Sequence, residues 1–258
     1  MTTILLLKLC LVPSLIYLVT LVGRRWGPNA AGWFSALPIV AGPILLTMAI
    51  EQGPGFVATA AAHTLIAVIA VLVFCVAYAW ASGRFGVAGS LCAALIAYAA
   101  AVAGLQLVEL PLLPGFMLVV CVLAVAPRLF PRLQSAGARS AAQSNDLPWR
   151  MLAGALLCFV VTYAAAGIGP RLSGFFAMFP VMGTIIVGFS HHASGRAYAV
   201  NILLGMARGY YAFATFCVVL SLLLREQSIA LAFGVAAGAA LVVQLVSRRG
   251  LALAAKPA

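Results

Sequence analysis

The chain has little charge, and negative charge is the scarcest. Its 258 residues include 4 Asp and Glu against 15 Lys and Arg, and charged residues make up only 7% of the total. Hydrophobic residues make up 65%. A water-soluble globule of this size needs far more polar side chains to cover its surface. The composition therefore excludes a soluble protein and indicates an integral membrane protein.

Sequence signatures of most enzymes and metal sites are also missing. The chain contains no GxxxxGK[ST] nucleotide loop, no HExxH, no GxSxG and no paired carboxylates. Its 6 cysteines lie within apolar runs, none at CxxC spacing, so we interpret them as small buried hydrophobic residues. His191 and His192 are adjacent and would point in different directions on a helix, which disfavours chelation of one metal. We predict no enzyme activity, no cofactor and no metal site.

Long apolar stretches separated by short polar breaks predict helices that cross a membrane. About 20 apolar residues in a helix cross a hydrocarbon core of about 30 Å. Division of the sequence at glycines, prolines and charged residues gives such stretches at 3–22, 29–50, 56–81, 86–107, 111–127, 151–167, 172–190, 197–224 and 228–247. The predicted fold class is an all-α integral membrane protein with nine transmembrane helices.

The positive charges predict how these helices are oriented. With nine helices, eleven Lys and Arg lie on one face and three on the other. Cytoplasmic loops carry the excess of Lys and Arg, so the N-terminus is predicted outside and the C-terminus in the cytoplasm. The net charge of +11 therefore lies in loops that flank the membrane, and nucleic acid is not expected as a partner.

A segment in the first half of the chain returns in the second half at a constant offset, without insertion or deletion. The recurring residues are Gly27, Pro28, Gly32, Phe34 and Pro38, which match Gly169, Pro170, Gly174, Phe176 and Pro180. We interpret this pattern as duplication of one unit. Residues 1–107 form the first four-helix repeat, 108–149 a linker helix and cytoplasmic loop, and 150–258 the second four-helix repeat. Five crossings separate equivalent points, which predicts a 4+1+4 inverted-topology repeat.

Pro38 and Pro180 predict a break in the middle of each repeated helix. They lie ten residues after Pro28 and Pro170, about 15 Å into the membrane at 1.5 Å per residue. Proline removes the hydrogen bond to the carbonyl four residues earlier, so the carbonyls of Phe34 and Phe176 are expected to be free. Nearby, Gly42 permits bending and Thr184 adds a hydroxyl. Broken helices of this kind line substrate sites in transporters, although ordinary kinked packing helices remain an alternative reading.

Arg208 lies at the centre of the predicted helix 197–224. A basic side chain there costs about 2.5–3.5 kcal/mol on insertion scales, so it should face the protein interior and have a partner. The carboxylates all lie at helix ends or in the linker, at Glu51, Glu109, Asp146 and Glu226. We expect backbone carbonyls and an anionic substrate or head group to satisfy Arg208. The alternative is an arginine bonded only to carbonyls or stacked on a neighbouring tyrosine.

Three further polar side chains lie in or beside the predicted helices. His63 is in the helix 56–81, and its register partner Gly205 is one turn from Arg208, so His63 is a second candidate for the site. A packed, hydrogen-bonding histidine is the alternative. Lys8 and Arg150 open the first helix of each repeat and are expected to reach opposite membrane surfaces.

The run from Arg171 to Leu224 contains a Leu-x-Gly-x-x-x-x-Phe-Pro stretch, made of Leu172, Gly174, Phe179 and Pro180, and then Val187-Gly188. On these residues the run resembles the small GlpM-type bacterial membrane proteins. Those proteins are four-helix units, and both halves of the chain also resemble two-repeat bacterial membrane proteins. The resemblance implies a location in the bacterial inner membrane. It implies no reaction and no catalytic residues.

These features favour a small secondary transporter or facilitator for a small, anionic metabolite. The predicted site lies at the membrane midplane between the repeats and contains Arg208, His63, Pro38, Pro180, Phe34, Phe176, Gly42 and Thr184. A non-transporting membrane scaffold or accessory subunit is the alternative, and a lipid flippase is a third reading. The expected partners are membrane lipid and the small-molecule substrate, with a homodimer left open.

Overall fold

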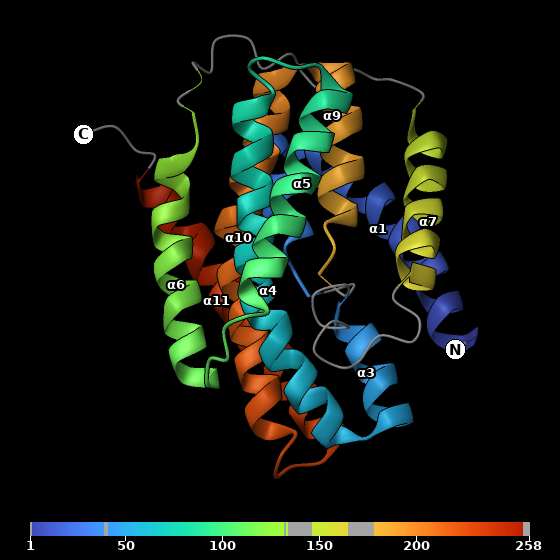
Figure 1. The fold of residues 1–258 in the computed structure, drawn as a ribbon, viewed down its shortest axis with the longest axis vertical. Helices are drawn as coiled ribbons and strands as arrows, with labels where there is room; N and C mark the ends of the chain where they lie inside the picture. The colour runs from blue at the N-terminus through green and yellow to red at the C-terminus, as the bar shows by residue number, and fades with distance from the viewer. Residues whose placement is uncertain (1, 39–40, 132, 134–145, 165–177, 255–258) are drawn as a thin grey trace.

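The fold is built from helices that lie roughly along one direction, with no strand among the described residues (Figure 1). A computed structural model describes residues 2–38, 41–131, 133, 146–164 and 178–254. The helices are α1 (Thr2–Trp26), α2 (Pro28–Ser35), α3 (Ala41–Gln52), α4 (Pro54–Ala81), α5 (Val87–Leu105), α6 (Leu112–Leu129), α7 (Leu147–Ala164), the π-helix η1 (Gly183–Val187), α9 (Gly188–Ser194), α10 (Arg196–Leu223) and α11 (Ile229–Ala254). The prediction of an all-α protein is confirmed for this part of the chain.

Five helices in the described part of the chain are long and apolar enough to cross a membrane. They are α4, α5, α6, α10 and α11, and they match the predicted spans 56–81, 86–107, 111–127, 197–224 and 228–247. A membrane-embedded protein is therefore supported by helix length and composition.

The predicted count of nine spans is not reproduced. The predicted span 29–50 is divided into α2 of 8 residues and α3 of 12 residues, about 12 and 18 Å long, and neither can cross the membrane alone. The helices α1 and α7 fall on the predicted spans 3–22 and 151–167 but are not among the five. The predicted span 172–190 lies partly outside the described residues.

The two longest helices of the core, α4 and α10, pack against each other in opposite directions (Figure 1). Near one end the Ser221 hydroxyl donates a hydrogen bond of 2.8 Å to the Ala58 carbonyl. Near the other end Arg196, at the start of α10, donates to Ser82 Oγ at 3.2 Å and to the Ala79 carbonyl at 3.4 Å. Both contacts join the beginning of one helix to the end of the other. The pair is therefore antiparallel.

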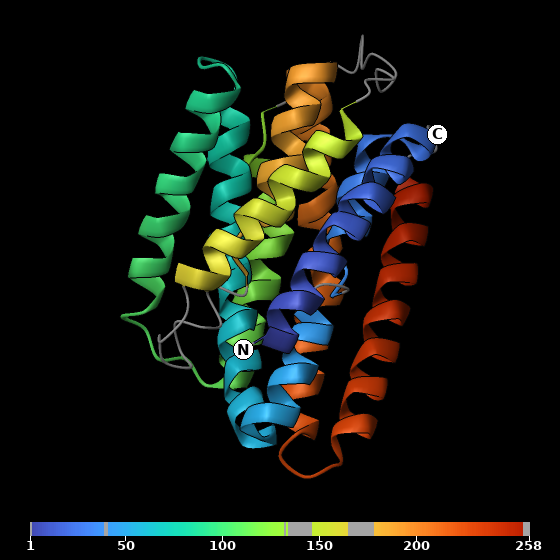
Figure 2. The ribbon, with the colours of Figure 1, turned by 90° about the vertical axis from the view of Figure 1, so that its right-hand side faces the viewer.

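The helices α2, α3, α5, α6, α9 and α11 pack against this pair, and α1 and α7 pack against each other outside it. The helices α1 and α7 lie side by side (Figure 2). A smaller apolar cluster joins them, through Val12 and Ile16 on α1 and Cys158 on α7. The outer helices α5, α6 and α11 bury only about a fifth of their most apolar stretch, at 17%, 22% and 22%. Apolar side chains that face outward in this way suit contact with lipid.

Equivalent elements of the two halves begin and end at the same constant offset that relates Pro28 to Pro170. Both ends of α4 and α10 obey this offset, as do the start of α3 and the start of η1, the ends of α3 and α9, and the starts of α5 and α11. Gly53 and Gly195, which precede α4 and α10, have φ of 90° and 87°, a backbone conformation that glycine adopts without strain. The backbone thus repeats the register found in the sequence.

Candidate functional site

The helices α2 and α10 touch backbone to backbone through small residues. A Cβ added at Gly205 would collide with the carbonyl oxygen of Asn29, and one at Gly32 would collide with the carbonyl oxygen of Ile202. One turn beyond Gly205, a Cβ at Gly209 would lie 2.7 Å from the Trp33 carbonyl oxygen. Small residues four apart allow membrane helices to approach closely, because no side chain separates them. This contact brings α2 against α10 on both sides of Arg208.

Arg208 lines a cavity of about 540 Å³ beside this contact. The lining residues come from α1 (Val22 and Trp26), α2 (Asn29, Ala30, Trp33 and Phe34) and α10 (Gly205 and Arg208). Small-molecule sites commonly have volumes of about 300–1,000 Å³, with apolar walls and a few polar groups. The cavity combines elements of the first half with one helix of the second half, and it contains two of the predicted site residues, Phe34 and Arg208.

The guanidinium of Arg208 makes no hydrogen bond or ion pair with any described residue. It also does not lie over an aromatic ring in the described part of the chain, where the cation–π pairs are formed by Arg25 and Arg150. Among the described residues, the expected bonds from Arg208 to backbone carbonyls are therefore absent, and so is the alternative of stacking on a neighbouring tyrosine. An arginine near the centre of a long apolar helix lies open toward a cavity.

Trp33, which forms one wall of the cavity, is held in place by α11. Its indole Nε1 donates to the hydroxyl of Ser247 at 3.3 Å. Its backbone carbonyl accepts a hydrogen bond of 2.8 Å from Gln244 Nε2. Gln244 is only 2% exposed, so α11 fixes both the backbone and the ring of Trp33 from the buried side.

The predicted break at Pro38 is present, but it does not free a carbonyl. The helix α2 ends at Ser35 and α3 begins at Ala41, and residues 36–38 between them are not helical. The carbonyl of Phe34 accepts a hydrogen bond of 3.2 Å from the Leu37 N–H. A tighter turn at the end of α2 replaces the bond that proline removes. The prediction of a free carbonyl at Phe34 is wrong for this reason, and Phe176 lies outside the described residues.

The second predicted break, at Pro180, precedes a π-helical turn. The Pro180 carbonyl accepts a hydrogen bond of 2.7 Å from the Thr184 N–H, and residues Gly183–Val187 then form η1. The Thr184 hydroxyl is buried and has no hydrogen-bond partner among the described residues. Short π-helical segments in membrane and soluble proteins occur frequently at functional sites. The equivalent residues of the first half begin the α-helix α3 instead, so the two halves differ here.

A second, smaller cavity of about 100 Å³ lies between the two breaks. The first half contributes Ser35, Ala36, Leu37 and Ala41 to its walls, and the second half contributes Met178, Phe179, Pro180, Val181, Met182 and Gly183, among others. On α10 the lining residues are Met206, Tyr210 and Phe213. The breaks are therefore brought together as predicted, around a mostly apolar space.

The two cavities are lined by different faces of α10, so the predicted single site is divided. Arg208 belongs to the larger cavity and Pro180 to the smaller, and no described residue lines both. Pro38 lines neither. His63 on α4 and Gly42 on α3 also lie outside both sets of lining residues. The structure thus brings Arg208 together with Phe34 but separates it from Pro180.

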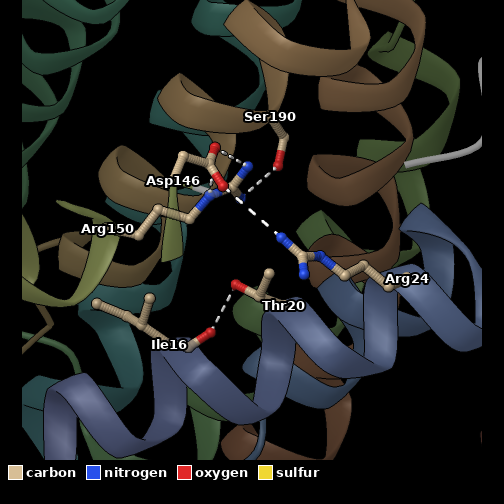
Figure 3. A network of polar contacts seen from close by, with 6 residues as sticks. All are labelled: Ile16, Thr20, Arg24, Asp146, Arg150 and Ser190. Carbon is tan, nitrogen blue, oxygen red and sulfur yellow. Dashed lines mark hydrogen bonds and ion pairs between the residues drawn. The ribbon is translucent and has the colours of Figure 1, made fainter. Parts of the chain in front are cut away.

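A buried ion pair joins the start of α7 to α1 and α9 (Figure 3). The Arg150 guanidinium donates to Asp146 Oδ2 at 3.0 and 2.7 Å and to Ser190 Oγ at 3.1 Å. Arg24, near the end of α1, lies 3.7 Å from Asp146 Oδ1. Arg150 is only 5% exposed. Arg150 does not extend into solvent, because a carboxylate and a hydroxyl enclose it, and its predicted level at a membrane surface stays a prediction. The structure describes only the backbone at Lys8.

A second polar contact joins His191, in the last turn of α9, to Tyr78 on α4. The Nδ1 atom of His191 lies 2.9 Å from the Tyr78 hydroxyl. Burial, followed by the positive charges of Arg196 and His192, lowers the pKa of His191 from its ordinary value. His191 therefore keeps its neutral form at lower pH than a free histidine would.

Several residues that shape the larger cavity were not predicted from the sequence. Trp33 and Asn29 are the clearest cases, and the signal for both was the pair of small-residue patterns Gly32-x3-Ala36 and Gly205-x3-Gly209. No group of three His, Cys, Asp or Glu able to hold a metal ion occurs in the described part of the chain. No protein-family model, curated protein or solved structure matches the chain.

Proposed function

We propose that the protein is a small secondary transporter or facilitator that carries a small anion through a site around Arg208. The most direct support is the cavity of about 540 Å³ that Arg208 lines. The Arg208 guanidinium makes no hydrogen bond or ion pair with the described residues. A charged side chain in the hydrocarbon region of a membrane protein is costly and is usually retained for function. A bound anion would offset that cost.

The proposal includes an inverted repeat as the basis of transport. Its support is the constant offset between element ends of the two halves, together with the antiparallel packing of α4 against α10. Inverted repeats build alternating access around a site at their interface. The Arg208 cavity fits this arrangement, since α1 and α2 come from the first half and α10 from the second. We further propose nine crossings, a bacterial inner membrane location and a cytoplasmic C-terminus, on the distribution of Lys and Arg.

The test begins with a thermal-shift screen of the purified protein against metabolite anions. A ligand present at about 100 times its Kd should add roughly 2.7 kcal/mol to the free energy of unfolding. Anions that stabilise the protein are then tested for uptake into proteoliposomes, with Arg208→Gln as the variant. Arg225→Gln is the matched control, because Arg225 is exposed in the turn that follows α10.

The expected result is anion uptake by the wild type and the control, and loss of uptake by Arg208→Gln with retained insertion and folding. Uptake that is unchanged in Arg208→Gln would remove Arg208 from the mechanism. A protein that binds and transports no anion would favour the non-transporting scaffold.

A further inference from the structure

The walls of the Arg208 cavity restrict the kind of anion that it can hold. Among the described residues that line it, Arg208 is the only one with a charge, and Asn29 has the only other polar side chain apart from the two indole N–H groups. A cation in a low-dielectric site is balanced best by one negative charge, because a second negative charge would remain unpaired and desolvated. The lining therefore favours a monoanion over a dianion.

The volume and the aromatic walls add a second restriction. Three of the lining residues are aromatic, namely Trp26, Trp33 and Phe34. A cavity of about 540 Å³ is far larger than an acetate or an inorganic ion requires, and a ligand that left most of it empty would forgo its apolar contacts. A ring-bearing ligand would fill the space and pack edge-to-face or offset against these side chains.

The geometry of Trp33 makes it a suitable stacking surface. Hydrogen bonds from α11 hold its ring and its backbone, at Ser247 and Gln244. A wall that is already ordered loses little conformational entropy when a ligand binds. Gly205 lies one turn before Arg208 on α10 and allows the backbone of α2 to approach closely at that point. The guanidinium of Arg208 and the indole of Trp33 therefore line the same cavity.

Further positive charge lies beside one wall of the cavity. Trp26 is 64% exposed, and the guanidinium of Arg25 lies 5.7 Å from the centre of its ring. Positive charge near a cleft raises the local concentration of anions. Arg25 therefore adds to the attraction of an anion toward the cavity that Arg208 lines.

We infer that the Arg208 cavity binds a monocarboxylate that carries an aromatic ring, with the carboxylate on Arg208 and the ring against Trp33 and Phe34. This inference rests on the proposed function and names its substrate class. Arginine recognises a carboxylate through two parallel N–H···O bonds, which a neutral amide or a single point charge cannot reproduce.

The test measures the dissociation constants of four related probes for the purified protein in nanodiscs of zwitterionic lipid. Phenylacetate has a ring and one charge, acetate has the charge without the ring, phenylacetamide has the ring without the charge, and benzylmalonate has the ring and two charges. We expect phenylacetate to bind at least about tenfold more tightly than each of the others. Phenylacetamide loses the hydrogen bond to a charged group, which contributes roughly a tenfold to hundredfold change. Acetate loses the apolar contacts of the ring, and benzylmalonate brings a second charge that has no partner in the site.

Two variants divide this preference into its parts. Arg208→Gln should abolish the preference for phenylacetate over phenylacetamide. Trp33→Leu should reduce the preference for phenylacetate over acetate and leave the preference over phenylacetamide in place. The matched controls are Arg225→Gln and Trp149→Leu, because both side chains lie outside the cavity and Trp149 is 66% exposed. Trp33→Leu retains Arg208, so it tests the inference even if Arg208→Gln fails to fold.

The outcomes separate the inference from the proposed function. Equal binding of acetate or benzylmalonate, lost in Arg208→Gln, would overturn the aromatic class and leave an anion carrier standing. No binding of any anion would overturn both. Phosphatidylglycerol added to the nanodiscs tests a lipid head group as the ligand. If it prevents phenylacetate binding and its own binding depends on Arg208, the cavity belongs to a lipid head group and the inference is overturned.

Discussion

Gly205 on α10 lies so close to Asn29 on α2 that a Cβ at position 205 would overlap the Asn29 carbonyl oxygen. This approach is possible only because glycine has no side chain. It sets the distance between α2 and α10, and with it the position of the cavity wall that contains Trp33. The sequence pattern of small residues therefore acts on the site through backbone packing.

Gly205→Ala is expected to push α2 away from α10 and to lower the free energy of unfolding by about 1–3 kcal/mol, as overpacking of a close interface does. The clash is with backbone, which cannot rotate aside as a flexible side chain can. Thermal unfolding of the variant in detergent measures the effect.

Gly234→Ala is the matched control for this substitution, because a Cβ at Gly234 on α11 meets nothing within 4 Å. Alanine has the higher helix propensity, so the control should be unchanged or stabilised by up to about 1 kcal/mol. Equal stability of the Gly205 and Gly234 variants would show that the close contact between α2 and α10 does not determine stability.

Asp146→Asn is expected to destabilise the protein by about 3–5 kcal/mol, since removal of one partner leaves a buried charge without compensation. The affected charge is Arg150, whose side chain is only 6% exposed and lies 2.7 Å from Asp146 Oδ2. Chemical unfolding measures the loss. Glu226→Gln serves as the control because Glu226 is exposed in a turn, and there a change within about 0.5 kcal/mol is expected.

The double variant Asp146→Ala with Arg150→Met should be more stable than Asp146→Asn alone, because it removes both buried charges. A double variant that is less stable than the single one would mean that Arg150 is held mainly by other contacts, such as Ser190.

His191 should make the stability of the protein depend on pH. Burial and the charges of Arg196 and His192 lower its pKa in the folded state, so below about pH 6.5 the unfolded chain takes up a proton that the folded chain does not. Stability is then greatest above that pH and falls as the pH drops toward the lowered pKa. The melting temperature of the wild type should fall more between about pH 7.5 and pH 5.5 than that of His191→Gln.

His192→Gln is the control for the pH experiment, since His192 is exposed whereas its neighbour His191 makes the partly buried contact with Tyr78. The control should keep most of the pH dependence of the wild type. An identical pH dependence in wild type and His191→Gln would assign the effect to another group.

The proposed topology has its own test, independent of the substrate. Reporter fusions after Gln52 and after Ser194, which are equivalent points of the two repeats, should give an external and a cytoplasmic signal, respectively, because five proposed crossings separate them. The same signal at both sites would contradict the inverted repeat.

The hydrophobic pattern, together with the prolines and glycines that interrupt it, was enough to predict much of the fold. The five long apolar helices, the break at Pro38 and the constant offset between the halves all follow from local sequence, because proline, glycine and run length act within one helix. The presence of Arg208 near Phe34 was also predicted correctly. These features could be predicted because they follow from the order of residues along each helix and from the offset between the two halves.

The parts that failed depend on how helices are turned and packed. Arg208 and Met206 are two residues apart and therefore about 200° apart around α10, which places them in different cavities once α2 lies against that helix. Arg150 was expected to reach a surface because it opens the first helix of the second repeat, and its burial beside Asp146 was not predicted. Their ion pair forms only when the start of α7 packs beside α1 and α9. No periodicity of the sequence encodes those distances.

The π-helical turn of η1 sets the orientation of α9, which makes polar contacts to two different helices. Rewinding of Gly183–Val187 into α geometry would rotate the helix that follows by about 100° per residue of slip. Because Ser190 and His191 both lie on α9, this rotation would separate Ser190 from Arg150 and His191 from Tyr78 at the same time. Loss of the extra residue in the π-helical turn would therefore break the contacts to α7 and to α4 together.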